Sequence, residues 1–275
     1  INAMKPTDEL YKSLYFAYQH FNKHLFTNTL PLVLFTLQRQ KGTMGYFIPD
    51  RWTSTSGKYC HEISINPAHM GSSRVIDVMQ TLVHEMVHCW QFCHGNPSRS
   101  GYHNKEWAYK MIDIGLQPSI TGEPGGGIVG NHMNDYVIDD GLFKRSCVNL
   151  IQNEDFHIPW IYRLIYSQAG TEYSFDIDSS DDSLDSIMIE SDSLQQQDSE
   201  LNFITESVLS NPEQYLYSSY KDLLPDKAFF SSPFNKNAKS KYQCPSCRLN
   251  VWAKPNIRLL CIECARELRD VSAWS

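Results

Sequence analysis

The sequence lacks a long hydrophobic run. No stretch of its 275 residues approaches the roughly 20 apolar residues that a bilayer-spanning helix needs. Residues 1–6 also lack the charged and apolar regions of a secretory leader. We therefore expect an intracellular protein without a membrane partner, cytoplasmic or, in a eukaryote, nuclear.

Basic residues are missing from one long interval. No lysine or arginine occurs between Arg163 and Lys221, whereas twelve acidic residues fall in the same interval. Runs of serine, aspartate and glutamine there bury too little apolar surface to order themselves. This pattern predicts a first domain over residues 5–166, a disordered acidic linker over 167–220, and a C-terminal domain over 221–275. The linker can also be interpreted as a competitor of nucleic acid for the protein's own basic surface.

The eight cysteines are too few and too unevenly placed for a disulfide framework. Four of them form two Cys-x-x-Cys pairs separated by thirteen residues, the spacing of a four-thiolate zinc site. Between the pairs, Leu249–Ala253 and Ile257–Leu260 are predicted to form two strands of a zinc ribbon. The predicted ligands of this structural zinc are Cys244, Cys247, Cys261 and Cys264.

The strongest motif lies in residues 81–91, where His84, Glu85 and His88 form a His-Glu-x-x-His pattern. On a helix, residues four apart share a face, so the two histidines can bind one zinc ion. Glu85 is then placed to accept a proton from a zinc-bound water. The alternative is a chance pattern in which both histidines are core residues bonded to the backbone.

A third zinc ligand must come from near or beyond the break at Gly95–Pro97, where His94 and His103 are the candidates. His94 has the spacing seen in metzincins, but Gln91 stands where those proteins have a glycine that turns the chain back. His103 begins a second helical pattern, and a helix returning antiparallel to the first would bring it to the metal. We favour His103.

The remaining patterns of the first domain predict an α+β fold, which the resemblance described below implies is zincin-like. Residues 7–26 show a helical apolar stripe, and residues 32–38, 46–48 and 59–65 are predicted strands. Ser72 or Ser73 is the expected N-cap of the zinc helix. We expect a small antiparallel sheet beside that helix, with an edge able to bind an extended peptide.

Residues from about Leu10 to Trp107 resemble the SprT-like zinc metallopeptidase family, which includes the Spartan-related DNA–protein crosslink proteases. The resemblance is carried by residues 62–67, 81–88 and 103–107, although Asn104 replaces the glycine that usually follows the third histidine. It implies that His84, His88 and His103 bind a catalytic zinc, that Glu85 is the catalytic base, and that a zinc ribbon follows the peptidase domain.

Basic and aromatic residues alternate around the cysteine pairs. Phosphates attract such cations and bases stack on such rings, so these residues predict contact with DNA, preferably single-stranded. A solvated surface of modest positive charge is the alternative. The residues proposed for this contact are Lys241, Arg248, Trp252, Lys254 and Arg258.

A glycine-rich stretch, residues 122–130, lacks the Gly-Lys-Ser/Thr ending of a phosphate-binding loop, so we expect a flexible loop beside the active-site cleft. His132 and Tyr136 follow it. They are interpreted as structural residues, with donation to a tetrahedral intermediate as the alternative.

Taken together, these patterns favour a zinc endopeptidase. The resemblance implies that it acts on DNA-bound or DNA-crosslinked proteins, and hence a nucleoid-associated or nuclear location. One rival is a non-catalytic nucleic-acid-binding module in which both zinc sites are structural. The other is an effector-like peptidase of soluble proteins whose ribbon recruits a protein partner. The sequence leaves oligomeric state open.

Overall fold

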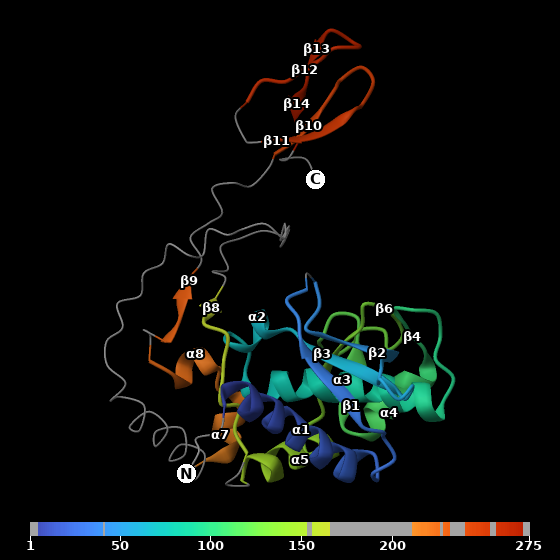
Figure 1. The fold of residues 1–275 in the computed structure, drawn as a ribbon, viewed down its shortest axis with the longest axis vertical. Coiled ribbons are helices and arrows are strands. Elements are labelled where there is room, and N and C mark those ends of the chain that lie inside the picture. Colours follow the sequence, from blue (N-terminus) through green and yellow to red (C-terminus); the bar gives the residue numbers. More distant parts are fainter. Residues whose placement is uncertain are drawn as a thin grey trace. The chain divides into compact units, whose positions relative to one another are not determined.

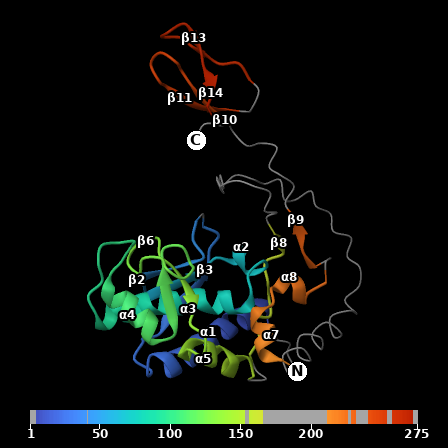
Figure 2. The ribbon, with the colours of Figure 1, turned by 180° about the vertical axis from the view of Figure 1, so that it is seen from behind.

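The computed structural model describes residues 5–40, 42–152, 156–165, 211–225, 228–231, 240–253 and 257–271. The chain divides into two compact units, residues 1–230 and residues 231–275. Figures 1 and 2 show the first unit as helices around a small sheet and the second as short strands only. The expected α+β class is confirmed.

The sheet of the first unit has the strand order β1-β3-β2. Its strands are β1 (Val33–Leu37), β2 (Gly45–Thr53) and β3 (Tyr59–Ile65). β2 pairs antiparallel with β3, but β1 pairs parallel with it, so the prediction of an antiparallel sheet was wrong. The chain reverses direction twice after β1, and β3 then inserts between the first two strands in the direction of β1. This leaves β2 at an edge.

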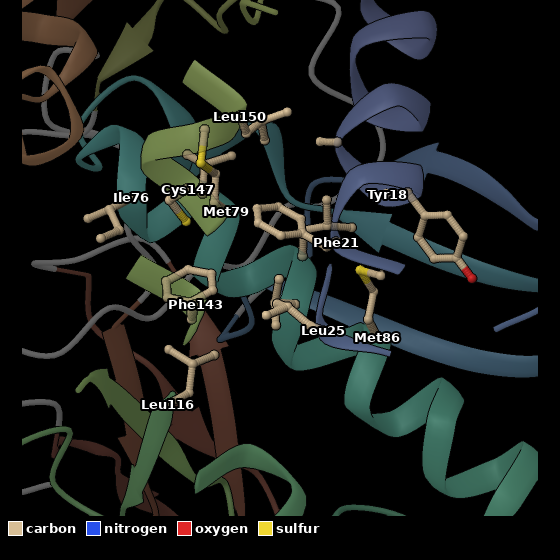
Figure 3. Close-up of a cluster of buried hydrophobic side chains, with 14 of the residues drawn as sticks. Tyr18, Phe21, Leu25, Ile76, Met79, Met86, Leu116, Phe143, Cys147 and Leu150 are labelled. Atoms are coloured by element: carbon tan, nitrogen blue, oxygen red, sulfur yellow. The ribbon is translucent and has the colours of Figure 1, made fainter. Parts of the chain in front are cut away.

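Two long helices, α1 (Pro6–Leu25) and α3 (Val75–His94), share one core with the inner face of this sheet. Apolar side chains recur along each at helical spacing, and they bury Phe21 and Met79 beside Ile63 and Ile65. Figure 3 shows Phe21 facing Phe143, and their ring centroids are 6.0 Å apart. The core therefore fixes α3, and with it the motif, against the sheet.

The shorter elements surround α3. The helices are α2 (Pro67–Met70), α4 (Lys105–Asp113) and α5 (Leu142–Ile151). The strands are β4 (Tyr102–His103), β5 (Leu116–Ser119), β6 (Gly130–Asn131) and β7 (Asn134–Val137), which pair as β4 with β6 and β5 with β7.

Residues 211–225 contribute two further helices, α7 (Pro212–Tyr217) and α8 (Tyr220–Leu223), to the core of the first unit. The backbone N–H of Val75 donates to the carbonyl of Ser218 at 3.1 Å, which fastens this segment to the start of α3. Figures 1 and 2 both show α7 beside α5. Strand β8 (Leu164–Ile165) pairs with β9 (Phe230–Ser231).

The predicted domain boundaries therefore need correction at one end. The sequence placed residues 211–220 in the acidic linker and residues 221–230 with the ribbon, but both belong to the first unit. The prediction did not recognise that four side chains in this segment are buried, namely Tyr215, Leu216, Tyr220 and Leu223. The predicted disorder of residues 167–210 lies outside the described residues.

The second unit contains β10 (Ser240–Gln243), β11 (Asn250–Ala253), β12 (Leu260–Cys261), β13 (Arg266–Glu267) and β14 (Arg269–Asp270). β10 lies between β11 and β14, and β12 pairs with β13. The strand predicted over residues 249–253 exists as β11. The one predicted over 257–260 does not, since β12 shares only Leu260 with it, and β11 and β12 pair with other strands. Instead, each Cys-x-x-Cys pair lies at the turn between two strands that pair with each other, β10 with β11 and β12 with β13.

No helix in the described ranges combines the length and the apolarity required to cross a membrane.

Candidate metal centre and active site

Helix α3 begins at Val75 with Arg74 as its N-cap, so the prediction of Ser72 or Ser73 as the cap was wrong. The side chain of Asp77 accepts a hydrogen bond from the backbone N–H of Arg74 at 2.9 Å and pairs with its guanidinium at 2.7 Å. This capping box satisfies a free N–H at the helix start. The helix then runs without interruption to His94, as Gln91 in place of a glycine predicted.

Three histidines converge on one point between α3 and β4. The ring centroids of His84 and His88 are 5.1 Å apart, and His103 lies 4.8 Å from His88 and 5.5 Å from His84. One nitrogen of each ring lies within 4.8 Å of those of the other two. The structure thus brings together the three histidines that the sequence proposed as ligands.

The spacing and protonation of this cluster fit a zinc ion. Nε2 of His88 lies 3.1 Å from Nε2 of His103, close to the roughly 3.3 Å that tetrahedral ligands at zinc–nitrogen distances of about 2.0–2.1 Å require. Burial lowers the pKa of His103 to about 4 and the pKa of His88 well below its usual value, with the neighbouring histidines adding to both shifts. Both rings are therefore neutral at pH 7, which is the form that binds metal.

His103 is positioned by the turn between α3 and α4. Asn104 is extended and caps α4 by accepting a hydrogen bond from the backbone N–H of Trp107 at 3.1 Å, which explains how this chain replaces the glycine usual at that position. The buried amide of Gln91 donates to the side chain of Asn104 at 2.7 Å and so ties α3 to the start of α4. The Trp107 ring packs 4.3 Å from that of His103 and contacts the other two histidines as well.

Glu85 is nearly inaccessible, with 6% of its surface exposed. It follows His84 on α3 and is hydrogen-bonded to the backbone of Phe47 on strand β2. Burial raises the pKa of Glu85 to about 7, against the opposing effects of the His84 charge and of a hydrogen bond with the backbone of Phe47. Gly45 lets β2 lie close to α3, since a Cβ atom at that position would lie 2.8 Å from the carbonyl of Ser64 and 2.9 Å from Cγ2 of Thr81. A carboxyl group that titrates near neutral pH suits a residue that accepts and returns a proton.

Asp135 is a functional residue that the sequence reasoning missed. Its Oδ2 accepts a hydrogen bond from Nδ1 of His84 at 2.8 Å, which leaves Nε2 of His84 for the metal. Gln80 donates to Oδ1 and to the backbone carbonyl of Asp135, both at 2.8 Å. Although burial alone lowers the pKa of His84, the hydrogen bond to Asp135 and the charge of Glu85 raise it overall. Carboxylates in this position orient metal-binding histidines in many proteins.

We expect Asp135→Asn to weaken zinc binding at the histidine site about 10- to 100-fold, because the asparagine keeps the shape of the acceptor but removes its charge. Competition with a chromophoric chelator measures this. Zinc on the four cysteines is the internal control, and its release must be unchanged. Equal affinity of parent and variant at the histidine site would show that Asp135 plays no part in binding.

His94 is not part of the cluster. Its Nε2 lies 3.0 Å from the backbone carbonyl of Thr29 at the exposed end of α3. We therefore predict that His103→Ala lowers the zinc content from two ions per chain to one, while His94→Ala keeps both. Elemental analysis of the purified variants tests this, and loss of zinc from the His94 variant would refute the assignment of the third ligand.

The glycine-rich stretch joins β5 to β6 and touches the site at one end. Gly130 pairs with His103 across the strands, and its carbonyl lies 3.3 Å from Nδ1 of His103. Tyr136 neighbours Asp135 on β7, and alternation directs it to the opposite face of that strand. His132 is exposed, and its charge contributes only the smallest of the effects on the pKa of His103. Both placements favour the structural interpretation of these two residues.

The four C-terminal cysteines also converge. Their sulfur atoms lie within 4.8 Å of one another, and Sγ of Cys247 is 3.8 Å from Sγ of Cys261, as expected for tetrahedral thiolates at zinc–sulfur distances of about 2.3 Å. Arg248 and Ala265 follow the second cysteine of each pair with positive φ angles, so the two knuckles turn alike. Hydrogen bonds from the backbone of Cys247 lower the pKa of Cys244 to about 7, which favours the thiolate.

The residues proposed for DNA contact differ in their availability. Trp252 is 59% exposed, and Nζ of Lys241 lies 5.8 Å from the centre of its ring. Arg248 is exposed at the first knuckle. Arg258 pairs with Glu267 at 2.6 Å, and Lys254 lies outside the described residues.

A histidine pair on a helix, a third histidine from the next segment and a buried glutamate define a metallopeptidase-like arrangement. A profile of the SprT-like family matches residues 14–122. A Salmonella typhimurium protein, described as "Uncharacterized protein in mucB 3'region", is 46% identical over 54 residues, which are 20% of this chain and 73% of that protein. No solved structure matches the chain. The chain belongs to the SprT-like family, whose members are metallopeptidase-like.

Proposed function

We propose that this protein is a zinc-dependent endopeptidase whose general base is Glu85. The observation that carries the proposal is the buried glutamate beside three converging histidines, two of which are neutral at pH 7. A purely structural zinc site has no use for a carboxyl group in that place. The same observation argues against the rival in which both zinc sites are structural.

His84, His88 and His103 would hold the metal, and Asp135 orients His84 through Nδ1. Zinc, when bound, would supply a Lewis acid that acidifies water and polarises a peptide carbonyl. The Glu85 carboxylate would accept a proton from a water molecule whose oxygen forms the new C–O bond to the peptide carbonyl carbon. It would then give the proton to the amine nitrogen as the C–N bond breaks, so the carboxylate is regenerated in each turnover.

Strand β2 is suited to hold the substrate. It is an edge strand, so its outer N–H and C=O groups can pair with an extended peptide, and its residue Phe47 is bonded to Glu85. A peptide added along this edge therefore passes beside the general base. Backbone pairing of this kind selects extended conformation rather than a particular side chain.

We further propose that the substrates are proteins bound or crosslinked to DNA, and that the ribbon binds single-stranded DNA through Trp252, Lys241 and Arg248. An exposed indole with a lysine beside it provides a stacking face and a phosphate contact. The family resemblance supports the same substrate class. Recruitment by the ribbon would confine an otherwise unselective cleft to proteins on DNA.

A cleavage assay on a DNA-crosslinked protein tests both parts, with the same protein free in solution for comparison. We expect the crosslinked protein to be cleaved faster, and Trp252→Ala to reduce that advantage without changing cleavage of the free protein. Equal cleavage of both proteins would instead support the rival peptidase of soluble substrates. Absence of any cleavage by the zinc-loaded protein would refute the peptidase assignment.

A further inference from the structure

The outer face of the sheet in the first unit contains a buried carboxylate. Glu62 on β3 is 1% exposed, and it accepts hydrogen bonds from Thr36 at 3.0 Å, from Tyr46 at 2.8 Å and from Nε1 of Trp52 at 2.6 Å. Among the described residues, no cation lies within ion-pair distance of it. Burying a carboxylate without a counter-charge is costly, so its hydrogen bonds must be well satisfied.

Trp52 is held in place by this carboxylate and remains open to solvent. The indole N–H is engaged with Glu62, yet the side chain is 42% exposed. Leu34 on β1 and Leu32 just before it are also exposed. The indole is therefore fixed on the surface of the sheet, with part of its ring free to meet a partner.

The backbone before Trp52 is distorted to place it there. The register of β2 shifts between Ile48 and Trp52, and Asp50 within the shift has a positive φ of 48°. Nδ1 of His61 accepts the backbone N–H of Asp50 at 3.0 Å and lies 3.2 Å from its carboxylate. Irregularities of this kind re-aim side chains, and aspartate is among the few residues other than glycine that adopt a positive φ readily. The irregularity in β2 and the buried carboxyl group of Glu62 thus both position the exposed indole of Trp52.

Two exposed cations lie close to Trp52 along the chain. Arg51 precedes Trp52, and Lys58 lies just across the turn that joins β2 to β3. Asp50 adds one carboxylate whose side chain is 53% exposed, and the carboxylate of Glu62 is buried. A fixed aromatic face with exposed cations at the same end of the hairpin complements a chain that carries phosphates and stackable bases.

We propose that Trp52, Arg51 and Lys58 form a second contact for single-stranded nucleic acid, located on the first unit and separate from the ribbon. A base stacks on the Trp52 indole, and Arg51 and Lys58 meet the flanking phosphates. Trp52 follows Phe47 by five residues on the same strand, so the two are at most about 17 Å apart along it. Nucleic acid held there lies next to the strand that presents the peptide. The choice of nucleic acid rests on the proposed function.

The test is fluorescence anisotropy of a labelled single strand titrated with the full chain at several salt concentrations. In a Trp252→Ala background, which isolates the contact on the first unit, Trp52→Ala should weaken binding about tenfold. The double variant Arg51→Gln/Lys58→Gln should make the slope of log affinity against log salt less negative by about 1.4, since each lost phosphate contact on a single strand contributes about 0.7.

A matched control is available on α4, where Lys105 and Tyr109 are an exposed cation and an exposed aromatic residue. Lys105→Gln and Tyr109→Ala should change neither affinity nor slope. If Trp52→Ala unfolds, as thermal melting would reveal, the double variant decides, because both of its side chains are exposed. An unchanged slope in the double variant, or a folded Trp52→Ala that binds like its parent, overturns the proposal. A chain that binds no single strand even at low salt refutes the ribbon contact as well.

Discussion

Replacing Glu85 by glutamine is expected to lower the rate of peptide cleavage about 10²- to 10⁴-fold while the protein keeps both zinc ions. Glutamine has the shape of glutamate but cannot accept a proton, so only the proton transfer is removed. Its side-chain oxygen can still accept the hydrogen bond from the Phe47 backbone. The buried site gains no unpaired charge, and the melting temperature should therefore stay close to that of the parent.

The Glu85→Gln result is read from single-turnover cleavage together with elemental analysis of the same sample. His94→Ala is a suitable control, because it alters a histidine at the end of the same helix that contacts Thr29 instead of the cluster. Its cleavage rate should equal that of the parent. Undiminished cleavage by Glu85→Gln with a full zinc load would remove Glu85 from the mechanism.

A chain truncated after residue 166, the end of the first domain predicted from sequence, is expected not to fold. The truncation removes four side chains from the core, Tyr215, Leu216, Tyr220 and Leu223. Fully burying a side chain of this size stabilises a protein by about 1.5–3 kcal/mol, so their loss amounts to roughly 6–12 kcal/mol. That is comparable to the whole stability of a typical domain, about 5–15 kcal/mol.

The matched variant for this prediction is a chain truncated after Ser231, which keeps α7, α8 and β9 and removes only the second unit. It should unfold cooperatively on heating and retain one zinc ion. Circular dichroism and thermal melting of the two truncations provide the comparison. A cooperative transition in the shorter chain at the temperature of the longer one would show that residues 211–225 are dispensable for the fold.

Some features could be predicted from the sequence because local patterns determine them. The strand over residues 59–65 was predicted with the bounds it has, since alternation and a following Asn-Pro mark it. The helix around His84 and His88 follows from its apolar spacing, and Gln91 indicated that it continues. The four cysteines follow from their spacing alone, because a tetrahedral thiolate site imposes it.

Other features depend on contacts between distant segments. Asp135 lies 51 residues from His84 and belongs to a short strand without a motif, so no local signal links the two. The parallel pairing of β1 likewise depends on which strand inserts between the others. Residues 211–225 looked like linker because only four of their side chains are buried and because they directly follow an acidic, serine-rich stretch.

The most direct test of the central claim is the cleavage rate of the full chain as zinc is returned stepwise to metal-free protein. The four thiolates should fill first and restore no activity. Cleavage should then rise in proportion to the second equivalent, as His84, His88 and His103 become occupied, and saturate at two ions per chain. Cleavage by the metal-free protein, or a fully loaded protein without activity on any protein substrate, would contradict the account.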